Sequence, residues 1–227
     1  MCIRDSGLQY TYKLNKKNTI NIGAVYTLGR TLHGDAYKYH QTGAESNGSI
    51  YVQSQTGDTI PNPFKMPHTF GIGLTYVYDN RLTIGVDYTL QKWNTADLAW
   101  SKFNKESVEM NSRTKIAFGA EFVPSYISHN YLKRIRYRMG AYYSSPYNKV
   151  SYTSPDTGTT SFQDGAREYG VSIGFGLPMF QSKSMLNISG QYIKVSPKFK
   201  GLMEENYLRI NIGLTFNERW FMKWKVD

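Results

Sequence analysis

Residues 206–216 read "NYLRINIGLTF", and this stretch decides the fold because two classes of side chain alternate along it. Every second position is apolar, and the positions between are polar or glycine: Leu208, Ile210, Ile212, Leu214 and Phe216 against Arg209, Asn211, Gly213 and Thr215. Successive side chains of a β-strand point to opposite faces of its sheet. The stretch therefore predicts a strand with one apolar face and one polar face.

The same alternation recurs along the chain, for example in "TINIGAVYTL" (19–28) and "RLTIGVDYTL" (81–90). The spacing of apolar residues in a helix fits none of these stretches. No linker or composition shift marks a domain boundary. The pattern predicts an all-β chain with nine strands, at 7–14, 18–30, 67–79, 81–93, 112–123, 132–145, 166–177, 184–195 and 205–217.

The connections between these strands alternate between short and long. The short ones are "NKK" (15–17), "DN" (79–80), "PSYISHNY" (124–131) and "FQSKS" (180–184), and the long polar ones span 31–66, 94–111, 146–165 and 196–204. Outer-membrane barrels have short periplasmic turns and long extracellular loops. The alternation therefore predicts an antiparallel transmembrane β-barrel in the outer membrane of a Gram-negative cell, with its C-terminus in the periplasm.

Composition excludes several other classes. The net charge is +10, but the basic residues are scattered rather than clustered, so no nucleic-acid partner is expected. The mean hydropathy of −0.50 does not argue against a barrel, whose strands expose only alternate residues to lipid. The histidines lack the spacing of metal ligands, and we expect no metal, no cofactor and no enzymatic activity: His33, His40, His68 and His129.

Aromatic residues gather near the predicted strand ends, at Tyr10 and Tyr12, Tyr76 and Tyr78, Tyr88 and Trp93, Tyr142 and Tyr143, and Trp220 and Phe221. Aromatic girdles of this kind lie at the two interfaces of a membrane barrel. The ordinary preference of tyrosine for strands is an alternative explanation.

The polar strand face supplies the candidate ligand-binding residues Arg134, Arg136, Arg138, Lys115, Glu121, Asp87 and Arg209. The arginines are spaced by two residues and are predicted to lie on one inward face, with Lys115 and Glu121 on the neighbouring strand. They would attract a carboxylate headgroup or, alternatively, form an ion-pair lattice that braces the wall. The inward glycines at 71, 73, 174 and 176 would leave room for a plug or ligand, or ease the curvature of the sheet.

Loop residues offer a further, external binding site. Lys38, His40, Lys102 and Lys105 would bind lipopolysaccharide phosphate, although a solvated loop explains the same residues.

The C-terminal third carries a resemblance to a known family. The segments "EYGVSIGFGLPMF" (168–180), "SMLNISGQYIKV" (184–195) and "EENYLRINIGLTFNERWFMKWK" (204–225) resemble the last three strands of FadL-type outer-membrane transport proteins of Bacteroidetes, over residues 166–224. The resemblance implies a barrel of about 14 strands with an N-terminal hatch. It also implies diffusion of long-chain fatty acids or aromatic hydrocarbons through the barrel wall. With nine strands present, it implies a chain truncated at its N-terminal side.

The opening residues 1–6, "MCIRDS", differ from everything that follows and contain Cys2, the one cysteine. They resemble the translation of an adaptor used in sequencing libraries. We therefore interpret residues 1–6 as an artefact and residues 7–227 as part of a single barrel domain.

The expected function is outer-membrane transport of hydrophobic compounds such as long-chain fatty acids. One alternative is a structural or secretion-associated outer-membrane barrel that moves no small molecule. The other is a soluble β-rich binding protein. The expected partners are outer-membrane lipid and lipopolysaccharide, a hydrophobic small molecule and the barrel-assembly machinery.

Overall fold

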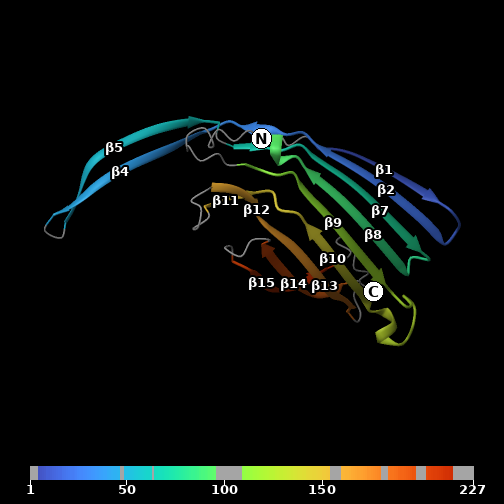
Figure 1. The fold of residues 1–227 in the computed structure, drawn as a ribbon. Coiled ribbons are helices and arrows are strands. Elements are labelled where there is room, and N and C mark those ends of the chain that lie inside the picture. Colours follow the sequence, from blue (N-terminus) through green and yellow to red (C-terminus); the bar gives the residue numbers. More distant parts are fainter. Residues whose placement is uncertain are drawn as a thin grey trace, which may run out of the picture.

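A computed structural model describes residues 5–46, 49–62, 64–95, 109–153, 160–179, 184–197 and 203–216. Nine strands form one antiparallel sheet in the order β1-β2-β7-β8-β9-β10-β13-β14-β15 (Figure 1). Their bounds are β1 Asp5–Lys13, β2 Asn18–Thr27, β7 Thr69–Tyr78, β8 Leu82–Gln91, β9 Arg113–Phe122, β10 Arg136–Ser144, β13 Ala166–Pro178, β14 Met185–Pro197 and β15 Glu205–Thr215. The nine predicted strands and the all-β class are confirmed.

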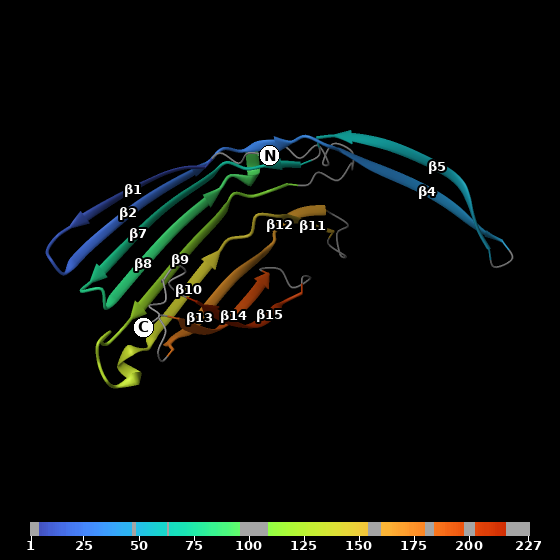
Figure 2. The same ribbon diagram turned by 180° about the vertical axis from the view of Figure 1, so that it is seen from behind.

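The sheet is a single curved layer, seen from both sides in Figure 1 and Figure 2. Its edges are β1 and β15, and they do not pair with each other, so the described sheet is open. Residue partners followed across the sheet lead from Lys13, the last residue of β1, to Asn211, inside β15. This stagger is typical of strands that tilt in a curved wall.

The two faces of the sheet differ as the alternation predicted, because directly paired residues share a face. One paired row on the apolar face runs Tyr10, Ile22, Leu74, Val86, Phe118, Ala141, Val171, Tyr192 and Leu208. Nothing described packs on this face: Ile72 is 60%, Met139 62% and Leu208 76% exposed. A soluble sandwich would bury such a face against a second layer.

Aromatic side chains lie on the apolar face near both ends of the strands. At the short-turn side, Tyr78, Phe122, Tyr137 and Phe175 belong to one paired row. At the long-loop side lie Tyr26, Phe70, Tyr88, Tyr143 and Tyr169. On β10 the two borders are six residues apart, about 20 Å along the strand.

Three of the predicted girdle residues lie elsewhere. Trp93 belongs to a short 3₁₀ helix, η1 (Trp93–Thr95), that follows β8. Tyr142 pairs with Gly170 on the polar face, because it differs by one position from Tyr143, and the prediction for it is wrong. Tyr10 lies in the middle of the apolar face. Trp220 and Phe221 are outside the described residues.

The long excursion at 31–66 is not an irregular loop but a β-hairpin arm. The short pair β3 (Arg30–Leu32) and β6 (Phe64–Met66) leads into the long pair β4 (Asp35–Ser46) and β5 (Ser49–Pro61). The arm extends away from the sheet on the side opposite the short turns (Figure 1). A second hairpin, β11 (Lys149–Thr153) with β12 (Thr160–Asp164), occupies the excursion at 146–165.

Two of the short connections between strands have a defined local structure. Asp79 and Asn80 both have positive φ, 49° and 53°, and Arg81 N donates to Tyr78 O at 2.9 Å, as in a type I′ turn. Because Tyr78 pairs with Leu82, Arg81 is an additional residue between this turn and β8. The β9–β10 connection contains a short 3₁₀ helix, η2 (Tyr131–Arg134), so the strand predicted to start at 132 starts at Arg136. Within the described residues, no helix has the length and apolar character needed to span a membrane.

Candidate functional site

The polar face of the sheet holds six of the seven predicted site residues, and we treat this face as the candidate site. One paired row runs Thr83, Glu121, Arg138, Gly174, Ser189 and Asn211, from β8 to β15. Arg136, Lys115, Asp87 and Arg209 lie on the same face by the two-residue period of their strands. The seventh residue, Arg134, does not reach it.

Arg136 and Arg138 share one carboxylate. Arg138 Nε donates to Glu121 Oε2 at 2.6 Å, and Arg136 Nη1 donates to Glu121 Oε1 at 3.2 Å. Arg138 also donates from Nη1 to Asn187 Oδ1 at 2.8 Å, so its guanidinium joins β9 to β14 across the intervening β13. Of the two predicted roles, the contacts favour a lattice that braces the wall.

Glycines on β13 make this bridge possible. A Cβ at Gly176 would lie 3.1 Å from Arg136 Cβ and 3.4 Å from Asn187 Oδ1, and one at Gly174 would lie 3.7 Å from Arg138 Cβ. The space that these two glycines leave is bordered by Arg136, Arg138 and Asn187.

A second cluster lies near the long-loop end of the face. Arg113 Nε donates to Ser144 Oγ at 2.7 Å, and its Nη2 lies 3.7 Å from Glu168 Oε2. Tyr142 donates its hydroxyl hydrogen to Glu168 Oε1. Lys115 belongs here, with its Nζ 4.7 Å from the centre of the Tyr142 ring, and the expectation that it faces the arginines with Glu121 is wrong. The two lie at opposite ends of β9, so one strand cannot bring both to the same partner.

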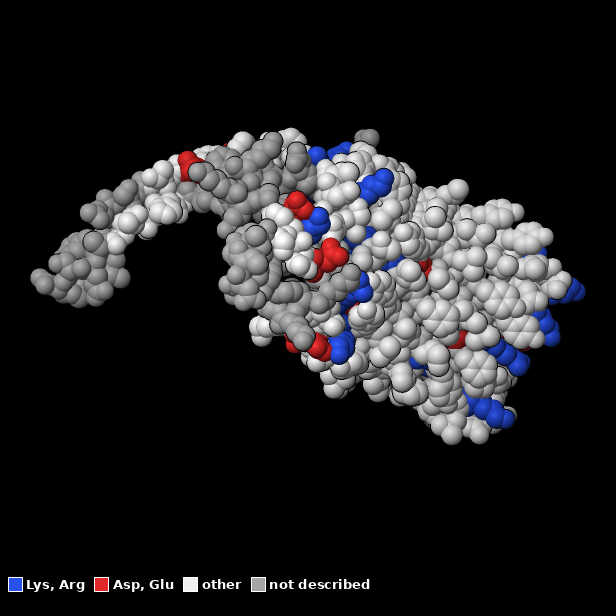
Figure 3. Space-filling view, in the orientation of Figure 1, with Lys and Arg blue, Asp and Glu red and all other residues white. Residues whose placement is uncertain are grey.

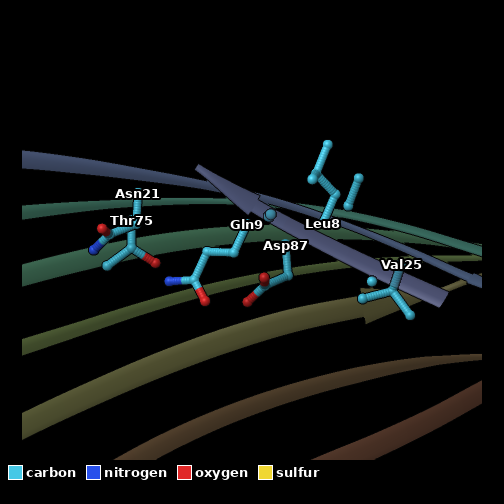
Figure 4. A pocket seen from close by; sticks show the side chains of 10 residues that line it. Leu8, Gln9, Asn21, Val25, Thr75 and Asp87 are labelled. Atoms are coloured by element: carbon cyan, nitrogen blue, oxygen red, sulfur yellow. The ribbon is translucent and has the colours of Figure 1, made fainter. Parts of the chain in front are cut away.

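Asp87 borders a hollow near the β1 edge of the sheet. The hollow measures about 420 Å³ and is lined by residues of β1, β2, β7 and β8. Gln9, Asn21, Thr75 and Asp87 project to the same side of the sheet, and Leu8 projects to the opposite side (Figure 4). Its floor contains Gly73, where a Cβ would meet Asp87 Oδ1 at 2.5 Å. The lining combines these polar side chains with Val25 and with three glycines, and its apolar part is the larger.

Arg134 lies in η2 and not in β10, which corrects the predicted row of three arginines. The side chain of Asn130 accepts from Leu132 N at 3.0 Å and starts the helical turn. The Arg134 guanidinium then lies 5.7 Å from the centre of the Tyr131 ring. Arg209 lies on the edge strand β15, paired with Gln191.

Two of the four predicted lipopolysaccharide residues fall within the described part of the chain. Lys38 and His40 lie on β4 of the arm, paired in register with Asp58 and Thr56. Lys102 and Lys105 are outside the described residues. The described part of the chain holds no group of three or more His, Cys, Asp or Glu residues placed to bind a metal ion.

Sequence reasoning missed Glu168, Asn187, Arg113 and Tyr142. Tyr142 is separated from Arg136 and Arg138 by an even number of residues along the strand, and this spacing could have predicted that it shares their polar face. No sequence signal fixed the register of β13 against β10, which brings Glu168 opposite Ser144 and beside Tyr142.

The site is therefore a set of polar contacts between neighbouring strands. Its ion pairs are partly exposed to solvent, with Arg138 and Glu121 side chains 38% and 27% exposed. Contacts of this kind each contribute about 1 kcal/mol or less to stability, and their main effect is to fix side chains and strands relative to one another.

Comparison with known proteins changes the family assignment. The model of the BamG family matches residues 4–227, nearly the whole chain. No curated protein matches the chain. The match covers the segment 166–224 on which the FadL-type resemblance depended, and that resemblance is wrong. Alternating strands that end in an aromatic tail are a general property of outer-membrane barrels, so they did not distinguish the two families.

The new assignment agrees with the coarser expectations. An outer-membrane-associated protein fits both the BamG match and the all-β sheet, and the family name points to the barrel-assembly machinery, one of the expected partners. The interpretation of residues 1–6 stays a prediction. With the match extending over residues 4–227, the chain belongs to the BamG family.

Proposed function

We propose that this protein is a structural, non-enzymatic component that works with the barrel-assembly machinery of the outer membrane. The observation that carries the proposal is the BamG match over residues 4–227. The contacts on the polar face support it, because the arginines predicted to bind a ligand are engaged with Glu121 and Asn187 within the wall.

The sheet is proposed to stand in the outer membrane as part of a closed transmembrane barrel. Its apolar face would contact lipid, and its short turns and C-terminus would lie in the periplasm. Edge strands cannot face hydrocarbon with their backbone groups unpaired, and bacterial barrels have even strand numbers. Further strands would therefore complete the wall between β1 and β15.

Transport of hydrophobic compounds through the barrel remains an alternative proposal. The described hollow does not decide between the two roles, because Gln9, Asn21 and Asp87 line it together with Val25 and three glycines. Lipid around the apolar face and lipopolysaccharide at the long-loop end remain proposed partners.

Depletion of the protein separates the two roles. An assembly role predicts that other outer-membrane barrels lose their folded, heat-modifiable forms while their unfolded chains accumulate in the periplasm. A transport role predicts slow growth on fatty acids with an unchanged set of folded barrels. The measurement is quantitative proteomics of the membrane fraction, together with electrophoresis of heated and unheated samples. Normal assembly of every other barrel would refute the proposed role.

A further inference from the structure

Three neighbouring connections at the short-turn end are hydrogen bonded to one another. Asp79 N donates to Lys17 O at 2.7 Å, which ties the β7–β8 turn to the β1–β2 turn. Val123 N donates to Arg81 O at 2.7 Å, and the Tyr126 hydroxyl donates to Asn80 O, which ties the β9–β10 connection to the same turn. We call residues 14–17, 79–81 and 123–135 the turn platform.

The largest part of the platform, 123–135, is itself folded. Val123 is fully buried and Ile135 is 7% exposed, so each end of the connection is anchored. Between them, Ser125 N donates to Lys133 O at 2.8 Å, and the Tyr137 hydroxyl donates to Leu132 O at 3.0 Å. A surface held in this way loses little conformational entropy when it binds a partner.

Two apolar side chains stand out from this folded connection. Ile127 is 93% and Leu132 is 62% exposed. Tyr126, next to Ile127, has its ring centre 5.8 Å from Cζ of Arg136, a residue of the polar face. The connection therefore passes the short-turn end of the polar face at Tyr126, and at Leu132 it meets Tyr137 of the aromatic border of the apolar face.

The same platform is positively charged. Its described residues include the cations Lys16, Lys17, Arg81, Lys133 and Arg134, and the acid among them is Asp79, which pairs with Arg81 at 3.4 Å. Figure 3 shows Lys and Arg side chains along the right-hand edge of the molecule, where Figure 1 places the short turns. Fixed apolar anchors within a charged rim are typical of protein interfaces.

We propose that the turn platform is the docking surface for an acidic segment of a barrel-assembly protein in the periplasm. Apolar side chains of that segment would pack on Ile127 and Leu132, and its Asp and Glu residues would face the platform lysines. This inference rests on the proposed function. An anionic lipid headgroup would match the charge but would leave the apolar pair uncovered, and for this reason we favour a protein.

Site-specific photo-crosslinking of the full chain in its own outer membrane tests the docking. A benzophenone amino acid replaces Ile127, and in a second protein it replaces Tyr37, an exposed residue of the arm. We expect the probe at position 127 to crosslink to an identified barrel-assembly protein within a peptide rich in Asp and Glu. The probe at position 37 should give no such product.

Charge reversal supplies the matched comparison. The triple variant carries Lys16→Glu, Lys17→Glu and Lys133→Glu. It should lower the yield of the crosslink by about tenfold, because exposed charge pairs act cumulatively on association. A control variant makes the same change of charge near the long-loop end and should leave the yield unchanged. It carries Lys65→Glu, Lys92→Glu and Arg167→Glu. Raising the salt concentration should lower the wild-type yield several-fold.

The outcomes are distinct. An unchanged yield after reversal of the platform lysines, or binding of vesicles rich in phosphatidylglycerol in place of any protein, overturns the docking inference. Co-purification with the machinery without a crosslink from position 127 also overturns it and leaves the proposed function standing. Absence of co-purification together with normal barrel assembly refutes the proposed function itself. If the triple variant fails to reach the membrane, Leu132→Ser tests the apolar contact alone, and a yield equal to wild type counts against the inference.

Discussion

The two ends of the sheet handle charge in opposite ways. Near the long loops, three cations form ion pairs within the chain: Lys149 with Glu109 at 2.6 Å, Lys194 with Glu204, and Arg113 with Glu168. At the short turns, cations outnumber acids on a platform that also exposes Ile127 and Leu132. The difference agrees with the proposal that the short-turn end meets another molecule.

The contrast between the two ends of the sheet depends first on the turn platform being rigid. Val123→Asp tests this rigidity and should have the largest effect on the free energy of unfolding. A carboxylate at a fully buried site without a partner should lower the free energy of unfolding by about 3 kcal/mol or more. The control Ile127→Asp, at a 93% exposed site, should change it by about 0.5 kcal/mol or less. Urea unfolding of protein in lipid vesicles measures both. Equal losses would mean that the platform is not anchored as described.

Removal of a carboxylate distinguishes the polar face from the surface pairs. Glu121→Gln leaves Arg136 and Arg138 without their shared partner and should cost about 1 to 3 kcal/mol of unfolding free energy. Glu109→Gln removes only the more exposed pair with Lys149 and should cost about 0.5 kcal/mol. The same vesicle assay applies. A larger loss at Glu109 would reverse the contrast between the two clusters.

Glycine substitutions examine the long-loop cluster. A Cβ at Gly170 would overlap the Tyr142 ring, so Gly170→Ala should displace that ring from Glu168 and cost about 1 to 3 kcal/mol. Gly119→Ala is the control, because no described atom lies within 4 Å of its Cβ position, and it should be neutral or slightly stabilising. Thermal shift of the folded band on unheated gels reports the difference. A tolerated Gly170→Ala would show that Tyr142 is not fixed by this contact.

The smallest effect is expected in the β7–β8 turn. Asn80→Gly should stabilise the sheet by a few tenths of a kcal/mol, and Asn80→Val should destabilise it by about 1 kcal/mol, because a β-branched residue resists positive φ. Both keep the backbone oxygen that accepts from Tyr126. Urea midpoints provide the measurement. The opposite order would contradict the I′ geometry.

The sequence predicted the sheet well because a strand with one apolar and one polar face has a visible period. The arm was missed for the same reason: β4 and β5 have no sheet behind them, so nothing imposes an alternation on their side chains. The start of β10 was missed because Arg134 and Ile135 continue the polar–apolar alternation of the strand, while the Asn130 side chain starts a 3₁₀ turn before them.

The site was only partly predictable. Period two placed Arg136, Arg138 and Glu121 on one face, and the short β9–β10 connection made their strands neighbours. Asn187 reaches Arg138 across β13, and such a contact depends on register between strands, which a single sequence does not state. The strand pattern could not identify the family, because the strands of every lipid-facing β-barrel show the same alternation of apolar and polar residues.

The β4–β5 arm has a consequence for how the cell surface would be reached from outside. Its longer strand has 13 residues, and β4 alone would extend about 40 Å at the rise of a strand. With the long-loop end outside the cell, as proposed, the arm would carry Tyr37 and Tyr39, both more than 60% exposed, well beyond the membrane. An antibody or a phage approaching the cell would meet this hairpin before it met any other described part of the protein.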